Sequence, residues 1–125
     1  MPPRRRTDPV AGRAALAAWR AAPDEVSTAD RRAAVRFTLE ELADVAPGNA
    51  VEVRVPPDGA VQAVVGPRHT RGTPPNVVET DPQTWLALAT GSLRWADAMA
   101  AGRVHASGER ADLSEWLPLQ AARPR

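Results

Sequence analysis

The sequence has 125 residues, of which 43% are hydrophobic, and its formal net charge at pH 7 is +1, with 16 basic residues that are all arginine and no cysteine. A chain of this length fits one domain, in which folding buries roughly two-thirds of the surface that the unfolded chain exposes. The lack of cysteine excludes disulfides, thiolate nucleophiles and thiolate metal ligands, and the nearly balanced charge gives no electrostatic reason to expect a nucleic-acid partner.

We expect residues 1–8 to form a flexible basic arm. Three consecutive arginines, Arg4 to Arg6, follow two prolines, and such chain ends are generally solvated and at most touch an acidic membrane surface peripherally. The segment after the arm is interrupted by a proline and by charged residues such as Arg13 and Arg20, so it has the pattern of neither a signal peptide nor a membrane span. Together with the lack of cysteine, this favours a cytoplasmic protein.

Two helices are predicted in the first part of the chain. The alanine-rich segment from Pro9 to Ala22 favours a helix, which Pro23 ends. A second helix begins with Ser27 or Thr28 as its N-cap and runs to about Val45. Its apolar residues recur at helical spacing and predict one face that packs against a sheet: Val35, Leu39, Leu42 and Ala46.

A β-hairpin is predicted over residues 50–66. The stretch NAVEVRV alternates valines with Glu52 and Arg54, which is typical of a half-buried strand. The turn PPDG at residues 56–59 reverses the chain, and AVQAVVG forms the returning strand. Prolines and glycines in residues 67–76 predict a loop, and NVVET then predicts a third strand.

The last third of the chain predicts three short helices and one strand. Asp81 caps the first helix, which Gly91 ends, and Ser92 caps a second helix that runs through Ala101. A strand from Arg103 to Ser107 follows, and a final helix from Ala111 to Leu117 is closed by Pro118.

This order of elements predicts an α+β fold. We expect a small mixed or antiparallel sheet with helices packed over one face, in a single domain that spans residues 9–120 and is followed by a tail at residues 121–125.

Catalytic and metal-binding patterns are absent from the sequence. The two histidines, His69 in the predicted loop and His105 in a predicted strand, lack metal-ligand spacing. No nucleophile elbow, phosphate-binding loop or zinc-protease helix occurs. Glu40 and Glu41 are adjacent and point about 100° apart on a helix, which indicates a charged face. We therefore expect no catalytic residue, no metal and no cofactor.

Large apolar side chains are concentrated late in the sequence, including Trp85, Trp95 and Trp116. Such residues usually fill the core of a small domain. Short helices that carry Trp, Leu and Met over a sheet can also leave an apolar cavity for a small hydrophobic ligand. Periodicity alone leaves both readings open.

Residues 79–119 resemble the C-terminal part of the sterol carrier protein family. The resemblance lies in the order strand, short helix, glycine, second helix, strand and closing helix, and five residues fall where the family has its turn glycines and its penultimate strand: Gly91, Gly102, Arg103, Val104 and Gly108. The helix and hairpin over residues 27–66 come in the same order. The sequence looks most like the compact, stand-alone actinobacterial members, and its first helix is an addition to their pattern.

The resemblance implies helices over a mixed sheet and an apolar interior cavity, a tunnel that binds fatty acyl chains, sterols or related lipids without catalysis. On this hypothesis eight large apolar residues line the tunnel: Phe37, Leu42, Trp85, Leu88, Leu93, Trp95, Met99 and Trp116.

A second hypothesis stays open, because the same fold serves as an accessory domain in some enzymes, including mycothiol-dependent isomerases. The chain would then be a non-enzymatic module with a filled core that docks to a partner enzyme through its arginine arm or the loop at residues 67–76. A carrier should contain a cavity of a few hundred Å³, whereas a docking module should expose an apolar patch.

Overall fold

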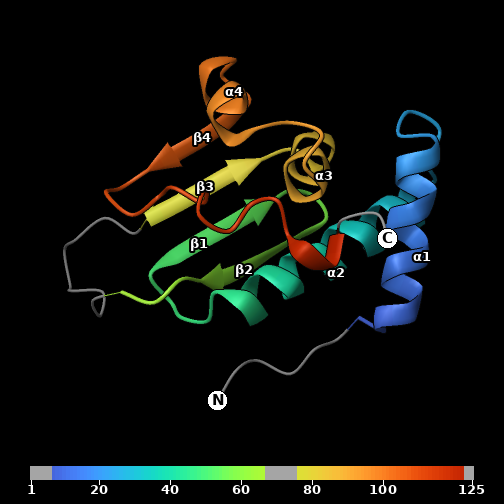
Figure 1. Cartoon of the computed structure of the whole chain (residues 1–125), viewed down its shortest axis with the longest axis horizontal. Helices are drawn as coiled ribbons and strands as arrows, with labels where there is room; N and C mark the ends of the chain where they lie inside the picture. Colours follow the sequence, from blue (N-terminus) through green and yellow to red (C-terminus); the bar gives the residue numbers. More distant parts are fainter. Residues whose placement is uncertain (1–6, 67–75, 123–125) are drawn as a thin grey trace.

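The computed structural model describes residues 7–66 and 76–122 and has the α+β architecture expected from the sequence (Figure 1). The arginine arm up to Arg6, the loop at residues 67–75 and residues 123–125 of the tail lie outside the described residues. The elements in chain order are α1 (Pro9–Ala21), α2 (Thr28–Val45), β1 (Val51–Val55), β2 (Gly59–Ala63), β3 (Asn76–Thr80), α3 (Pro82–Thr90), α4 (Trp95–Ala100), β4 (Val104–Ser107) and a short 3-10 helix, η1 (Gln120–Ala122).

The four strands form a mixed sheet in the order β2-β1-β3-β4. β1 pairs with β2 as the predicted antiparallel hairpin and with β3 in parallel, and β4 is antiparallel to β3 at the edge. β1 and β3 are therefore the central strands, and β2 and β4 lie at the edges.

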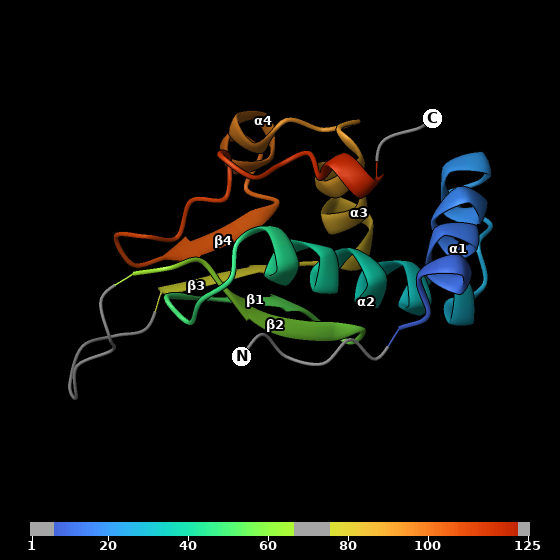
Figure 2. The same cartoon turned by 60° about the horizontal axis from the view of Figure 1, so that its bottom comes forward.

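The two faces of the sheet differ in chemistry. On the inner face the pairing brings Val61, Val53, Val78 and Ala106 into one row across all four strands, and α2 and α3 cover this face (Figure 2). On the outer face the same pairing places Arg54, Glu79 and His105 side by side. No helix of the described residues lies over the outer face. The predicted one-sided arrangement of the helices is therefore confirmed.

Helix α2 forms as its sequence predicts. The hydroxyl of Ser27 accepts a hydrogen bond from the backbone N–H of Asp30 (3.1 Å) and so caps the helix. Its predicted apolar stripe is buried from Val35 to Ala46. The helix also buries Phe37, because α1 packs on a second side, where the ring lies so close to Gly12 that any Cβ there would collide with it.

The turn between β1 and β2 is held by charged residues of α2. Asp58 has a side chain with no exposed surface, and both of its carboxylate oxygens accept hydrogen bonds from Arg31 (2.8 and 3.0 Å). Arg32 lies 3.7 Å from the same carboxylate, and Arg36 donates to the carbonyl oxygen of Asp58 (3.1 Å). The hydrogen bond to Asp58 raises the pKa of the Arg31 guanidinium. These contacts attach the hairpin to the first half of the helix.

Two predictions for the last third of the chain are wrong. Helix α4 begins at Trp95 rather than after Ser92, because residues 91–93 fold back on the end of α3: the N–H of Leu93 and the hydroxyl of Ser92 both donate to the carbonyl of Ala87 (3.1 and 3.4 Å). Ser92 is therefore occupied at the end of one helix and does not cap the next.

The predicted helix from Ala111 to Leu117 is a single turn instead, in which the N–H groups of Trp116 and Leu117 donate to Leu113 (3.0 and 3.2 Å). Pro118 ends the turn as predicted, since it lacks an N–H and disfavours a helical conformation at the preceding residue, and the part that is missing is the beginning of the helix. At the start of this segment, Asp112 accepts a hydrogen bond from the N–H of Ser114 (2.8 Å), which lowers the pKa of the Asp112 carboxyl.

Val64, directly after β2, has a conformation that is unusual for a β-branched residue, with φ at +72°. Its N–H donates to Ala46 (2.6 Å) and its carbonyl accepts from Ala50 (2.9 Å), so it connects the sheet to the residues after α2. Opposite Val64, Gly48 also has a positive φ, and a Cβ at Gly48 would lie 2.2 Å from the carbonyl oxygen of Val64.

We expect Val64→Gly to be more stable than Val64→Ala by about 0.5–1 kcal/mol. Both variants lose the buried valine side chain, but glycine relieves the left-handed strain of about 1–2 kcal/mol, which exceeds its usual disadvantage to alanine. At Val65, which is 78% exposed and has no positive φ, the order should be reversed. Urea unfolding of the four variants measures both differences, and a more stable Val64→Ala would contradict the strain.

We expect Asp58→Ala to lower the free energy of unfolding by about 2–3 kcal/mol. Breaking a buried ion pair typically costs about 3–5 kcal/mol, and the partial exposure of Arg31 places this pair at or below the lower end. Glu52→Ala removes an exposed carboxylate paired with Arg54 and should cost less than about 1 kcal/mol. Similar losses from the two variants in denaturant unfolding would argue against a special role for Asp58.

Candidate functional site

The apolar layer between the inner face of the sheet and helices α2 and α3 is the first candidate site. Trp85 and Leu88 of α3 are fully buried there, together with Leu42 of α2 and Val53 of β1. Inside the layer the indole N–H of Trp85 donates to the hydroxyl of Thr38 (2.8 Å), and that hydroxyl donates to the carbonyl of Ala34 (2.8 Å). Trp85 therefore contacts α2, and its buried indole N–H has a hydrogen-bond acceptor.

The segment after β4 covers part of this layer. Leu113 and Leu119 are fully buried in the core, and the N–H of Leu119 donates to the carbonyl of Ala89 in α3 (2.9 Å). A Cβ built on Gly91 would contact Pro118 at 3.3 Å. The chain thus returns across α3 without needing the helix that its sequence predicts.

The eight residues predicted to line a tunnel fall into three groups. Phe37, Leu42, Trp85 and Leu88 are fully buried. Leu93, Trp95 and Trp116 are partly buried and pack against the core. Met99 is 39% exposed. Most of them therefore meet in or beside one apolar core, and their assignment to a tunnel stays a prediction, as does the predicted interior cavity.

Phe37 contacts the added N-terminal helix. Its ring contacts Gly12 of α1, and the guanidinium carbon of Arg13 lies 5.7 Å from the ring centroid. Both partners belong to the added N-terminal helix, which places Phe37 in the contact between α1 and α2.

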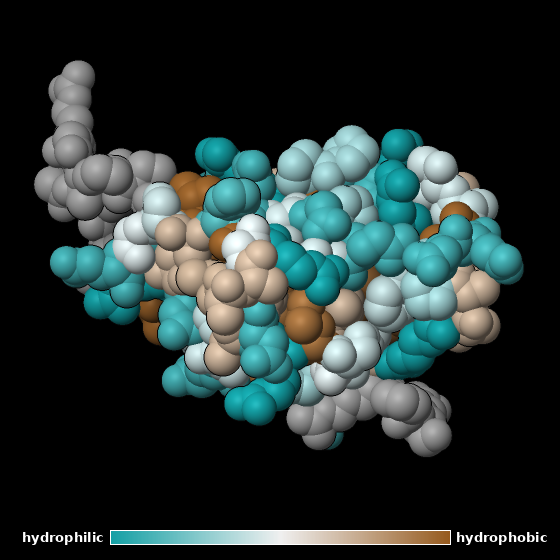
Figure 3. Space-filling view, turned by 90° about the horizontal axis from the view of Figure 1, so that it is seen from above, coloured by the Kyte–Doolittle hydropathy of each residue, from teal (hydrophilic) through white to brown (hydrophobic). Residues whose placement is uncertain are grey.

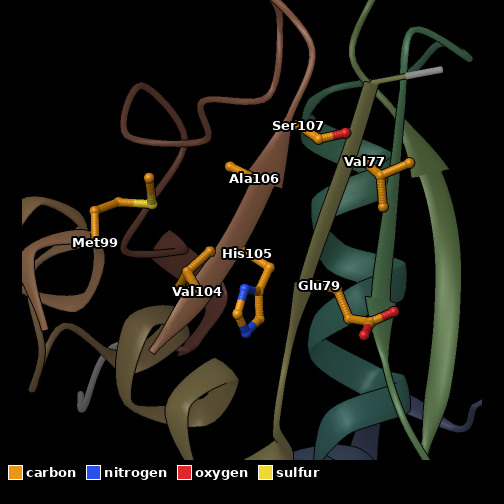
Figure 4. A pocket seen from close by; sticks show the side chains of 7 residues that line it. All are labelled: Val77, Glu79, Met99, Val104, His105, Ala106 and Ser107. Carbon is orange, nitrogen blue, oxygen red and sulfur yellow. The ribbon is translucent and has the colours of Figure 1, made fainter. Parts of the chain in front are cut away.

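The second candidate site is a pocket of about 530 Å³ at the β4 edge of the sheet. Figure 4 shows it from the outer face, with α2 behind the strands. Seven residues from β3, α4 and β4 line it: Val77, Glu79, Met99, Val104, His105, Ala106 and Ser107. Of the residues predicted for the tunnel, Met99 alone lies among them. The sequence contained one sign of the pocket, since Val77 and Val78 are adjacent and strand alternation must turn one of them outward.

The charges beside this pocket are unevenly shared. Arg54 lies between two carboxylates: its Nε contacts Glu52, and its Nη1 is 4.0 Å from Glu79. Together, Arg54, Glu52 and Glu79 carry one net negative charge. Because Arg54 lies closer to Glu52 than to Glu79, most of this charge remains on Glu79, which lines the pocket. His105 lies directly opposite Glu79 in the neighbouring strand.

Among the described residues, no group of three or more histidine and acidic side chains is placed to hold a metal ion. No helix in the described ranges is long and apolar enough to cross a membrane.

The described surface exposes few large apolar side chains. The exposed ones are Val10, Val45, Val65 and Met99. Figure 3 looks onto the molecule from the α4 side and shows small hydrophobic patches separated by hydrophilic residues. This face does not present the continuous apolar patch expected of a docking module.

A family model described as a bacterial SCP ortholog matches residues 27–119. The match includes every element from α2 to β4 and leaves out α1, in agreement with the resemblance noted from residues 27–66 and 79–119. No curated protein matches the chain.

We expect Thr38→Val to destabilise the protein by about 1–3 kcal/mol, because the indole N–H of Trp85 would remain buried without an acceptor. Thr38→Ser keeps the hydroxyl and should cost about 1 kcal/mol or less, for the lost methyl group. Denaturant unfolding followed by tryptophan emission compares the two. A Thr38→Val variant as stable as the wild type would show that this hydrogen bond contributes nothing.

Proposed function

Because the chain belongs to the sterol carrier protein-like family of bacterial SCP orthologs, we propose that it binds an apolar small molecule or lipid without catalysing a reaction. The observation that carries the proposal is that the family match covers the elements from α2 to β4 that build the apolar layer. The proposal includes a cytoplasmic location, which the lack of cysteine favours.

The chemistry of the layer supports a ligand whose buried part is uncharged. The buried threonines have their hydroxyl groups engaged: Thr38 with Trp85, Thr80 with the carbonyl of Arg103 (2.7 Å), and Thr84 with the side chain of Arg103 (3.2 Å). Asp58, the buried acid, is paired with arginine at the hairpin tip. A ligand in this layer would therefore gain affinity from apolar contact rather than from a charged anchor.

Helix α4 supplies the entrance in this proposal. The helix has six residues and no side-chain hydrogen bond at its N-cap, and Ala98 is its one buried residue. It is joined to α3 through Gly91 and to β4 through Gly102, both with positive φ. Val104 belongs to the buried core and also lines the pocket beside α4, so a shift of α4 away from β4 would open the edge of the layer.

The close packing of the core favours the alternative, an accessory module that docks to a partner enzyme. Phe37, Leu42, Trp85 and Leu88 have essentially no exposed surface, as a filled core requires. The two functions differ in one measurable property, because a carrier binds an apolar ligand and a docking module does not.

We expect the protein as purified from a bacterial host to carry an apolar molecule that native mass spectrometry detects at near-equal molar ratio, and the delipidated protein to bind palmitate in a calorimetric titration. Leu88→Trp should weaken palmitate binding at least about tenfold, since the larger ring occupies the layer. Val10→Trp adds the same ring at an exposed position of α1 and should leave the affinity unchanged.

The thermal unfolding of ligand-free Leu88→Trp is compared with that of Leu88→Met, which conserves the side-chain volume. A cooperative transition of Leu88→Trp shows that weaker palmitate binding comes from a filled layer rather than from an unfolded protein. An empty wild-type protein that binds neither palmitate nor cholesterol would reject the carrier and favour the docking module.

A further inference from the structure

The pocket at the β4 edge, which we call the outer pocket, is distinct from the interior layer, although Val104 belongs both to its lining and to the core. Its polar residues Glu79 and His105 lie on the outer face of the sheet, and α2 is on the opposite side (Figure 4). Its volume of about 530 Å³ falls in the range of small-molecule sites, about 300–1,000 Å³. The pocket is therefore large enough for a small ligand.

One side of the pocket is apolar. Met99 of α4, Val104 and Ala106 lie together on the α4 side of β4 (Figure 4). Met99 is 39% exposed, although methionine is usually buried, and its flexible thioether adapts to ligands of different shape. This part of the pocket suits a hydrocarbon chain.

The other side of the pocket is polar and carries negative charge. Glu79 lines it with a side chain that is 45% exposed, and its cationic neighbour, Arg54, is held more closely by Glu52. His105 and Ser107 add a ring nitrogen and a hydroxyl. Among the seven lining residues Glu79 is the one acidic side chain. The pocket therefore complements a positively charged group that donates hydrogen bonds.

We propose that this outer pocket binds a small amphipathic amine, whose ammonium group contacts Glu79 and whose hydrocarbon part packs on Met99. A primary ammonium group fits because it has three N–H groups. They can be shared between the carboxylate of Glu79, the ring nitrogen of His105 and the hydroxyl of Ser107. The proposal does not depend on the interior carrier function, because it uses no residue of α2 or α3.

Three probes with the same hydrocarbon tail test the proposal: octylamine, octanol and octanoate. Their binding to the isotope-labelled full chain is followed by backbone amide shifts in nuclear magnetic resonance. We expect octylamine to bind about three to ten times more tightly than octanol and octanoate to bind most weakly. The largest shifts should fall on residues of β3, β4 and α4, with Trp85 and Leu88 unmoved.

Two variants assign the polar and apolar halves of the site. Glu79→Gln should weaken octylamine about three- to tenfold and leave octanol unchanged, whereas Met99→Ala should weaken both by a similar factor. Glu25→Gln is the matched control, since it removes an exposed carboxylate between α1 and α2 that does not line the pocket, and it should change octylamine binding less than twofold.

Equal affinity for the three probes, or an equal effect of Glu79→Gln and Glu25→Gln, would overturn the proposal. Octylamine shifts confined to Trp85 and Leu88 would overturn it too, while supporting the interior carrier. The absence of binding by palmitate together with selective octylamine shifts on β3 and β4 would reject the carrier function and keep the outer pocket.

Discussion

The contact between Asp58 and the arginines of α2 is the constraint on which the rest of the structure depends. A buried carboxylate is tolerated only when it is paired and hydrogen-bonded, so the tip of the β1–β2 hairpin has one position along the helix, beside Arg31. Because β1 also pairs with β3, and β3 with β4, fixing the hairpin against α2 also fixes the positions of the other two strands. The inner valines then lie beneath the apolar stripe of α2, and α3 brings Trp85 to Thr38.

The sheet separates two chemically different environments. The layer on the α2 side is apolar, and its buried hydroxyl groups are already hydrogen-bonded, which suits an uncharged lipid. The outer face carries alternating charges, and Glu79 lines the pocket there with a longer contact to Arg54 than the one Glu52 makes, which suits a cation. Helix α4 borders both, since Met99 lines the outer pocket and Ala98 is buried on its other side. A single short helix therefore lies beside both of the proposed sites.

Sequence reasoning succeeded where the signal was local and failed where a residue had a competing partner. Ser27 and Asp81 cap their helices through hydrogen bonds that span three residues, and the alternation in β1 appears as alternating burial. Ser92 looked like a cap of the same kind, but its hydroxyl donates to the preceding helix. The stretch from Ala111 to Leu117 has helical apolar spacing, yet Pro118 and the packing of Leu113 leave it one turn.

By itself, the sequence determined the local elements, the burial of the large apolar side chains and the membership of the SCP family, because caps, turns and alternation act within about four residues. Only the tertiary structure decided where each side chain points and which distant residues it contacts. Phe37 was predicted from the resemblance to line a tunnel, and the structure shows its ring beside Gly12 of α1, which is distant in the chain. The outer pocket required Glu79 and His105 to meet across two strands and Met99 to arrive from α4. Such contacts depend on strand pairing and packing between distant segments, and no local pattern encodes them.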